Sequence, residues 1–157
     1  MMKVDMEQTA TALKRPFEPK EILRRKGSGG REYEYIDARC VMKRLDDTVG
    51  LQNWQDKYFE TESGRVICEL SICLDGNWIT KSDGAGSTEF AGEKGAISAA
   101  FKRAAVKFGI GRYLYNPNAF TNGVPADWAT PEGFDRRTDT QLMNSKDSKD
   151  VRNGDRI

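Results

Sequence analysis

Apolar and polar residues alternate through the middle of the chain, most regularly from Val66 to Leu74. In a β-strand, a period of two places one set of side chains on a single, buried face. Asp75-Gly76 follows as a hairpin turn signal, and strand-like runs cover residues 54–61 and 78–83. The pattern predicts an antiparallel meander of about three strands. The residues that share the buried face of its central strand are Val66, Cys68, Leu70, Ile72 and Leu74.

Two stretches have helical periodicity instead. The first begins after Asp37, a residue type that caps helices, and ends at Gly50. The second covers about residues 94–108 and carries a basic side opposite its apolar side. These elements predict an α+β fold: an antiparallel three- to four-stranded meander packed against a long amphipathic helix, with a β-β-β-α core. The apolar faces comprise Ala38, Val41, Met42, Leu45 and Val49 in the first helix, and Ile97, Phe101, Ala104, Ala105 and Phe108 in the second.

The two ends of the chain have weaker patterns and set the expected domain bounds. Residues 1–16 have little periodicity and are expected to form a flexible N-terminal segment. A short helix over residues 19–26, a Gly-rich loop and a short strand over residues 33–36 are expected next. The ordered domain is expected to span residues 17–134. A disordered tail should follow over residues 135–157, because eleven charged residues there accompany few aliphatic ones.

Composition narrows the classes of function. The chain has no histidine, which excludes histidine triads, histidine-ligated zinc and histidine general bases. Its three cysteines include no CxxC pair, which argues against a disulfide framework and for a reducing compartment. No run approaches the roughly 18 apolar residues of a membrane span, and the first residues lack the apolar core of a signal peptide. These features favour a cytoplasmic protein without a membrane partner.

The net charge is only +1, but the charges are segregated along the chain. Residues 14–26 contain six basic residues and two acidic ones. Residues 46–93 contain ten acidic residues and three basic ones, whereas residues 94–112 contain five basic residues and no acidic one. A single run of this kind is typical of a solvated surface. Two basic runs around an acidic middle indicate a local electrostatic footprint for an anionic partner.

Patterns for catalysis or cofactor binding are incomplete. The Gly-rich segment over residues 84–92 lacks the Gly-Lys-Ser/Thr of a phosphate-binding loop. Asp46 and Asp47 are adjacent on a helix and point about 100° apart, so they do not form a metal pair. Glu89 and Glu93 have no partner nucleophile or base in the sequence. We therefore expect no catalytic residue, metal or cofactor. A magnesium-dependent nuclease that uses these acids is the enzymatic alternative.

What remains is a set of cations and tyrosines at element ends and on one helix face. Lysine and arginine side chains neutralise phosphates, and tyrosine rings stack on unpaired bases at ~1–3 kcal/mol per base. Phosphate contacts carry no sequence information, so the set indicates sequence-tolerant binding of a single strand. Ordinary strand packing is the alternative role of the tyrosines. The members are Arg24, Arg25, Lys26, Tyr33, Tyr35, Lys102, Arg103 and Lys107.

The order of these motifs resembles the N-terminal domain of the Rad-fifty-two single-strand annealing family. The resemblance covers about residues 19–116. Its last motif is most similar to the branch that holds phage annealing proteins and a bacterial DNA-damage-response protein. The motifs are RRKGSGG at residues 24–30, YID at 35–37, GLQNW at 50–54, AFKRAAVKFG at 100–109 and GIGRYLY at 109–115.

The resemblance implies a ring-forming sheet–helix fold with single-stranded DNA in a basic groove. Carried over by position, Arg25, Tyr35, Lys102 and Arg103 fall on the family's groove positions, and Lys94 falls on a further basic position. The implied activity is annealing of complementary strands without ATP, in recombination or double-strand break repair in a bacterial cell or phage-infected host. The alternative is a protein that caps or protects DNA ends without annealing them.

One departure from the family pattern concerns the late helix. Eukaryotic members have an arginine where this chain has Val106, and Lys107 is the candidate substitute. The segment between Ser82 and Lys94 is also shorter than theirs, so a second, outer DNA site is not expected. The family further implies a homo-oligomeric ring and a partner such as an exonuclease or a single-strand binding protein. The expected DNA-binding residues are Arg24, Arg25, Lys26, Tyr35, Lys94, Lys102, Arg103, Lys107 and Arg112.

Overall fold

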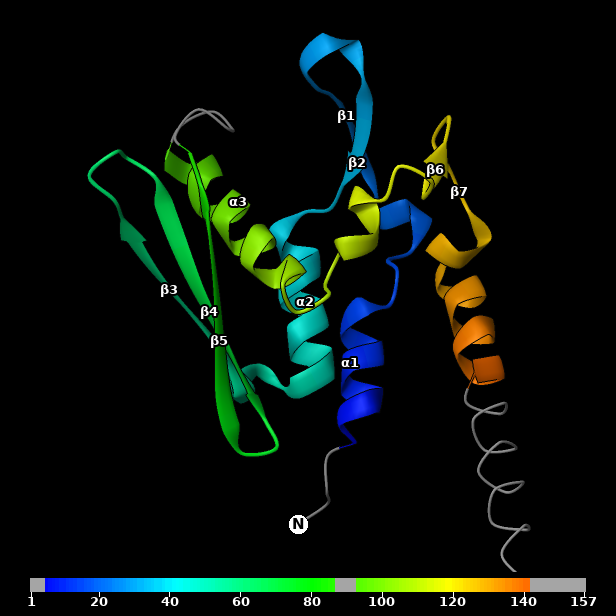
Figure 1. The fold of residues 1–157 in the computed structure, drawn as a ribbon, viewed down its shortest axis with the longest axis horizontal. Helices are drawn as coiled ribbons and strands as arrows, with labels where there is room; N and C mark the ends of the chain where they lie inside the picture. Colours follow the sequence, from blue (N-terminus) through cyan, green and yellow to red (C-terminus); the bar gives the residue numbers. More distant parts are fainter. Residues whose placement is uncertain (1–4, 87–92, 142–157) are drawn as a thin grey trace, which may run out of the picture.

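The computed structural model describes residues 5–86 and 93–141 of the chain (Figure 1). Its main sheet is an antiparallel meander of β3 (Trp54–Glu60), β4 (Val66–Leu74) and β5 (Asn77–Ala85), in that order. Asp75 and Gly76 form the turn between β4 and β5 with φ values of 52° and 78°. Aspartate and glycine tolerate this left-handed conformation better than most residues. The predicted meander and the α+β class are confirmed.

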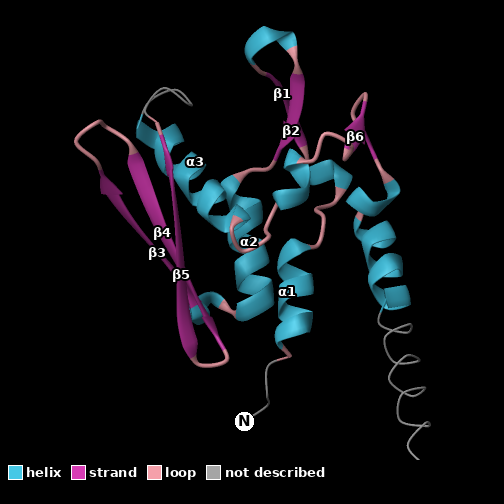
Figure 2. Cartoon of the chain, viewed as in Figure 1, coloured by secondary structure: helices cyan, strands magenta, loops and turns pink. Residues whose placement is uncertain are grey.

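Helix α3 (Glu93–Val106) covers one face of the meander (Figure 2). Phe101 fills the interface and is only 1% exposed, with its ring centroid 5.9 Å from that of Trp54. Ile97, which was expected on the buried face, is 45% exposed. The helix also buries small residues on a second side, because α2 packs against it as well. The β4 residues buried in this core are Cys68, Leu70 and Ile72, as the alternation predicted.

Helix α2 (Ala38–Val49) begins and ends where the sequence predicted. The side chain of Asp37 accepts a hydrogen bond from the backbone N–H of Arg39 at 2.8 Å, which satisfies a free donor of the first turn. Gly50 ends the helix with a φ of 90°. Val41 and Leu45 are fully buried, whereas Met42 lies at the edge of the apolar arc and is 39% exposed.

Much of the N-terminal segment, expected to be flexible over residues 1–16, forms a helix in the structure. Helix α1 (Met6–Lys14) packs against α2 and buries Leu13. The guanidinium group of Arg44 holds the end of this helix by donating to the carbonyls of Ala12, Leu13 and Arg15. One buried leucine and a long-range arginine thus stabilise a helix whose own periodicity is weak. Residues 1–4 lie outside the described residues.

The helix expected over residues 19–26 is wrong. A single 3₁₀ turn covers Pro19–Glu21, and the chain then forms β1 (Leu23–Lys26). This strand pairs antiparallel with β2 (Glu32–Tyr35), the strand expected nearby, to form a hairpin. Gly29 and Gly30 have φ values of 78° and 76° in the connecting loop, a conformation that glycine adopts readily. Cross-strand pairing therefore overrides the local helical preference.

After α3, the chain forms a 3₁₀ segment (Arg112–Tyr115) and a short hairpin of β6 (Phe120–Thr121) and β7 (Val124–Pro125). A helix then covers residues 131–141. Its Asp135 accepts two hydrogen bonds from Arg15, each 3.0 Å long. The segment expected to be disordered from residue 135 thus begins inside a helix, and residues 142–157 lie outside the described residues.

The elements are arranged in order outward from the meander. Figure 1 shows α3 and α2 beside the sheet, then α1, and the helix over residues 131–141 farthest from it. The β1–β2 hairpin projects from one end of the molecule, near the β6–β7 hairpin. None of the described helices is long and apolar enough to cross a membrane.

Candidate nucleic-acid interface

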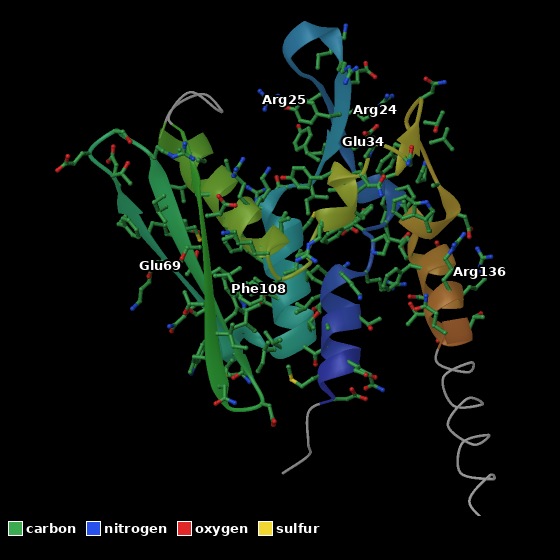
Figure 3. All side chains as sticks on the ribbon, in the orientation of Figure 1. Arg24, Arg25, Glu34, Glu69, Phe108 and Arg136 are labelled. Carbon is green, nitrogen blue, oxygen red and sulfur yellow. The ribbon has the colours of Figure 1, made fainter. Side chains whose placement is uncertain are left out.

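The β1–β2 hairpin presents two chemically different faces. Because side chains alternate along a strand, Arg25 shares a face with Tyr33, its cross-strand partner, and with Tyr35. Arg24 lies on the opposite face, across from Glu34. Figure 3 shows Arg25 on one side of the hairpin, and Arg24 with Glu34 on the other. The two tyrosine ring centroids are 6.3 Å apart, so the first face joins a cation to two aromatic surfaces.

An open groove of about 1320 Å³ lies between this hairpin and α3. Arg25 lines it from the hairpin, and Lys102 and Arg103 line it from α3. We call these three residues the groove cluster. The groove thus brings together cations and aromatic rings that are far apart in the sequence. The segment after α3 supplies further lining residues, among them Tyr115, Asn116, Phe120 and Asn122.

Lys102 is the half-buried member of the groove cluster. Its Nζ donates a hydrogen bond to the carbonyl of Ile36 at 3.1 Å and lies 5.4 Å from the centroid of the Tyr35 ring. Burial lowers the pKa of Lys102 from its usual 10.5; Asp37 raises this pKa and Arg25 lowers it. A phosphate beside Nζ would favour the charged form and raise the pKa again. An anionic ligand would therefore stabilise the ammonium group.

Arg103 is the more exposed cation of α3, with 45% of its side chain accessible. Its Nε lies 3.4 Å from Oδ1 of Asp83, an oxygen that also accepts a hydrogen bond from the backbone N–H of Gly84 at 2.7 Å. Exposed ion pairs of this kind contribute only ~0.2–1 kcal/mol. Asp83 thus orients the guanidinium group, and a phosphate can replace the Asp83 carboxylate as its partner at a small cost in free energy.

Lys107 and Arg112, which the sequence predicted at the same site, lie elsewhere. Because α3 ends at Val106, Lys107 leaves the helical pattern and its Nζ donates to the carbonyl of Ser82. Arg112 donates to the carbonyls of Val106 at 3.1 Å and Lys107 at 3.0 Å. Lys81 Nζ also donates to the Lys107 carbonyl, at 3.3 Å. We call Lys81, Lys107 and Arg112 the α3-end cluster, and none of these three lines the groove.

Comparison with known proteins gives the family. Residues 5–127 match the Rad52/22 family of double-strand break repair proteins. The chain belongs to the Rad52/22 family. A stretch of 97 residues is 37% identical to the Single-stranded DNA-binding protein DdrA of Deinococcus radiodurans. This stretch covers 60% of the chain and 42% of DdrA, so the chain spans less than half the length of that relative.

In this Rad52/22 family chain, Arg24 has a different environment from its neighbour Arg25. Its guanidinium group lies 2.7 Å from the carboxylate of Glu32 and 3.4 Å from that of Glu34. A Cβ at Gly123 would come within 2.7 Å of Arg24 Nη1, so the guanidinium group packs directly on the β6–β7 turn. Arg24 also borders the groove, but two carboxylates balance its charge.

Two more predicted residues lie at the ends of elements. Lys26 is exposed at the end of β1 and lines the groove. Lys94 is in the first turn of α3, and its side chain lies outside the described part of the chain.

Sequence reasoning missed the side of the groove that is formed by the segment after α3. Tyr115 is 68% exposed there, and Asn122 begins the turn that contacts Arg24. The Asn122-Gly123 pair is a turn signal, with φ values of 51° and 79°, that could have located this hairpin. Its position across from the β1–β2 hairpin depends on tertiary packing.

The adjacent acids Asp46 and Asp47 have separate partners in the structure. Asp46 Oδ1 accepts a hydrogen bond from Trp54 Nε1 at 2.8 Å, and Asp47 forms an ion pair with Lys43. Within residues 5–86 and 93–141, no three or more His, Cys, Asp or Glu side chains are grouped to hold a metal ion. Glu89 lies outside these ranges. The groove of this family member offers cations and aromatic rings, and Glu32 and Glu34, the carboxylate partners of Arg24, line it as well.

Proposed function

We propose that this chain binds single-stranded DNA in the groove and anneals complementary strands without ATP. The observation that carries the proposal is the groove cluster, whose cations come from two separate elements and line one open groove with Tyr33 and Tyr35. Membership of the Rad52/22 family and the identity to a single-stranded DNA-binding protein support the same ligand.

Binding is electrostatic and independent of base sequence in this proposal. Arg25, Lys102 and Arg103 contact phosphates and release counterions from the strand. Tyr33 and Tyr35 offer ring faces on which bases stack, whatever their identity. These contacts leave the pairing edges of the bases accessible, so a complementary strand can test them. Annealing then needs no chemical step, and we assign no catalytic residue.

We propose further that several copies of the chain assemble into a ring that holds one strand across adjoining grooves. One groove offers few phosphate contacts, whereas linked grooves gain avidity from high effective concentration. The apparent affinity should then rise steeply with oligonucleotide length. Native mass spectrometry should give multiples of the 17.7 kDa chain. A monomer that anneals DNA at full rate would contradict the ring and leave the groove intact as a proposal.

The test is an annealing assay with complementary oligonucleotides in the absence of ATP. The wild type should accelerate pairing, and Lys102→Ala/Arg103→Ala should lose about tenfold or more of that acceleration. Arg136→Ala/Arg137→Ala is the matched control, because both arginines pair with Asp127 and neither lines the groove. Figure 3 shows Arg136 well away from Arg25. The control should anneal like the wild type.

Three outcomes would contradict the proposal in different ways. Binding and nuclease protection without faster pairing would support the end-protection alternative. Magnesium-dependent loss of the oligonucleotide would support the nuclease alternative. An affinity insensitive to salt would contradict the groove itself, since each phosphate contact to a single strand contributes about −0.7 to the slope of log K against log salt.

A further inference from the structure

A second, smaller hollow lies beside the C-terminal end of α3, where α1 meets β4 and β5. Its volume is about 260 Å³, below the roughly 300–1,000 Å³ of sites for drug-sized ligands. Leu13, Leu74 and Ile79 contribute apolar surface to it. Ile79 remains 39% exposed, although it is a branched aliphatic residue. The hollow is therefore an apolar surface patch with room for one or two side chains.

The α3-end cluster forms the rim of this hollow. Lys81, Lys107 and Arg112 all line it, and none of its described lining residues is acidic. Each ammonium group has three donors, and the bonds found in the described part of the chain use one of them. These cations also lie near the carbonyl end of α3, whose partial negative charge is about half a unit. Three positive charges exceed that half unit, so the rim has a surplus of positive charge.

The surroundings favour a peptide over a nucleic acid. The groove cluster has tyrosine rings beside it, whereas the surface here is mainly aliphatic. Lys81 Nζ lies 5.3 Å from the ring centroid of Phe108. A cation thus already occupies a face of this ring, the one aromatic ring among the described residues that line the hollow. Bases therefore lack an open ring to stack on, while a confined aliphatic hollow suits an apolar side chain.

We propose that this hollow docks a short acidic peptide segment of another protein. A bulky apolar side chain of the segment enters the hollow, and flanking carboxylates pair with the α3-end cluster. The surface is separate from the groove, so docking leaves the DNA site open. The inference does not depend on the proposed annealing function, because it rests on different residues.

The test uses a fluorescein-labelled peptide, Gly-Asp-Glu-Phe-Leu-Asp-Glu-Gly, titrated with the full chain at low salt and followed by fluorescence anisotropy. One control peptide replaces the acids with Lys, and a second replaces Phe-Leu with Gly-Ser. Only the parent peptide should bind, because the hollow requires both negative charge and an apolar side chain.

Two variants probe the two parts of the site. Lys81→Gln removes a rim charge, and Ile79→Ser removes exposed apolar surface. Each variant should reduce the affinity for the parent peptide by about three- to tenfold. Lys57→Gln is the matched control, because Lys57 lies opposite Glu69 on the outer face of the meander (Figure 3). All three variants should still unfold cooperatively in thermal melting, which reports an intact fold.

Several results would overturn the docking site. One is a parent peptide that binds no better than its controls, and another is a loss of peptide affinity in Lys57→Gln as large as that in Lys81→Gln. An oligonucleotide that displaces the peptide, together with an equal loss of DNA affinity in Lys81→Gln, would show that the α3-end cluster binds DNA instead.

Discussion

The groove cluster and the α3-end cluster each contain three cations, but their surroundings differ. Two tyrosines accompany the groove cluster in an open groove of about 1320 Å³. Mainly aliphatic residues accompany the α3-end cluster in a hollow of about 260 Å³. There Lys81 and Arg112 donate to carbonyls at the end of α3, and Lys107 donates to the carbonyl of Ser82 on β5. The two clusters carry the same charge, so the different ligands proposed for them rest on the difference in their surroundings.

The strongest test of this difference is charge reversal in each cluster. Arg25→Glu/Arg103→Glu should reduce the affinity for single-stranded DNA by about 100-fold, because two phosphate contacts become repulsive. Lys81→Glu/Lys107→Glu changes the net charge equally and should change the DNA affinity less than about threefold. Fluorescence anisotropy with a labelled oligonucleotide measures both variants, and thermal melting checks their folding. Equal losses in the two variants would mean that total charge, not the groove, determines binding.

The aromatic difference gives the next prediction. Tyr35→Ala should reduce the affinity for single-stranded DNA by about tenfold, since it removes both a stacking surface and the ring beside Lys102. Tyr35→Phe keeps the ring and should bind within about twofold of the wild type. The same oligonucleotide titration measures both. An equal loss in Tyr35→Phe would assign the role to the hydroxyl group and contradict stacking.

Local signals made much of the fold predictable. The meander follows from strict alternation in β4, and α2 follows from a capping aspartate and a terminal glycine, Asp37 and Gly50. These signals depend on residues close together in sequence. The β1–β2 hairpin escaped prediction because β1 is exposed throughout and no alternation marks it, although the strand that became β2 was expected. Helix α1 escaped because Arg44, some 30 residues away, holds its end.

The candidate site was predictable only in part, for similar reasons. Helical spacing correctly predicted that Lys102 and Arg103 share a helix, but the expectation that they line one groove with Arg25 rested on the family resemblance. Lys107 was expected on the same surface because the predicted helix ran to residue 108. The helix ends at Val106, and that small difference places Lys107 in the other cluster. Sequence periodicity cannot locate a helix end to within one residue.

Lys102 should make the DNA affinity of the groove cluster depend on pH, a smaller effect than the two above. Its pKa is lowered by burial, so it loses its charge below pH 10.5, before ordinary lysines do. DNA affinity should fall several-fold as the pH rises through this range, because the protonated form binds phosphate. Lys102→Arg keeps its charge and should show a flat profile in oligonucleotide titrations between neutral and alkaline pH. A similar fall in Lys102→Arg would assign the effect to another group.

Stability should change with pH in the opposite direction. The folded state releases the Lys102 proton at a lower pH than the unfolded state does. Between the two pKa values the unfolded chain binds more protons at Lys102, so the Lys102 contribution to the free energy of unfolding should increase as the pH rises through this window. Urea titrations of the wild type and Lys102→Arg at several pH values measure this contribution, which only the wild type should show.

The smallest expected effect compares two neighbouring residues of β1. Arg24 faces Glu32 and Glu34, whereas Arg25 shares its face with two tyrosines. Arg24→Ala should therefore change DNA affinity less than about twofold and cost ~0.2–1 kcal/mol of stability, as exposed ion pairs do. Arg25→Ala should reduce the DNA affinity by about fivefold. It should also reduce the slope of log K against log salt by about 0.7, the contribution of one phosphate contact. If Arg24→Ala reduced the slope as much, DNA would contact both faces of the hairpin, and the division between them would be wrong.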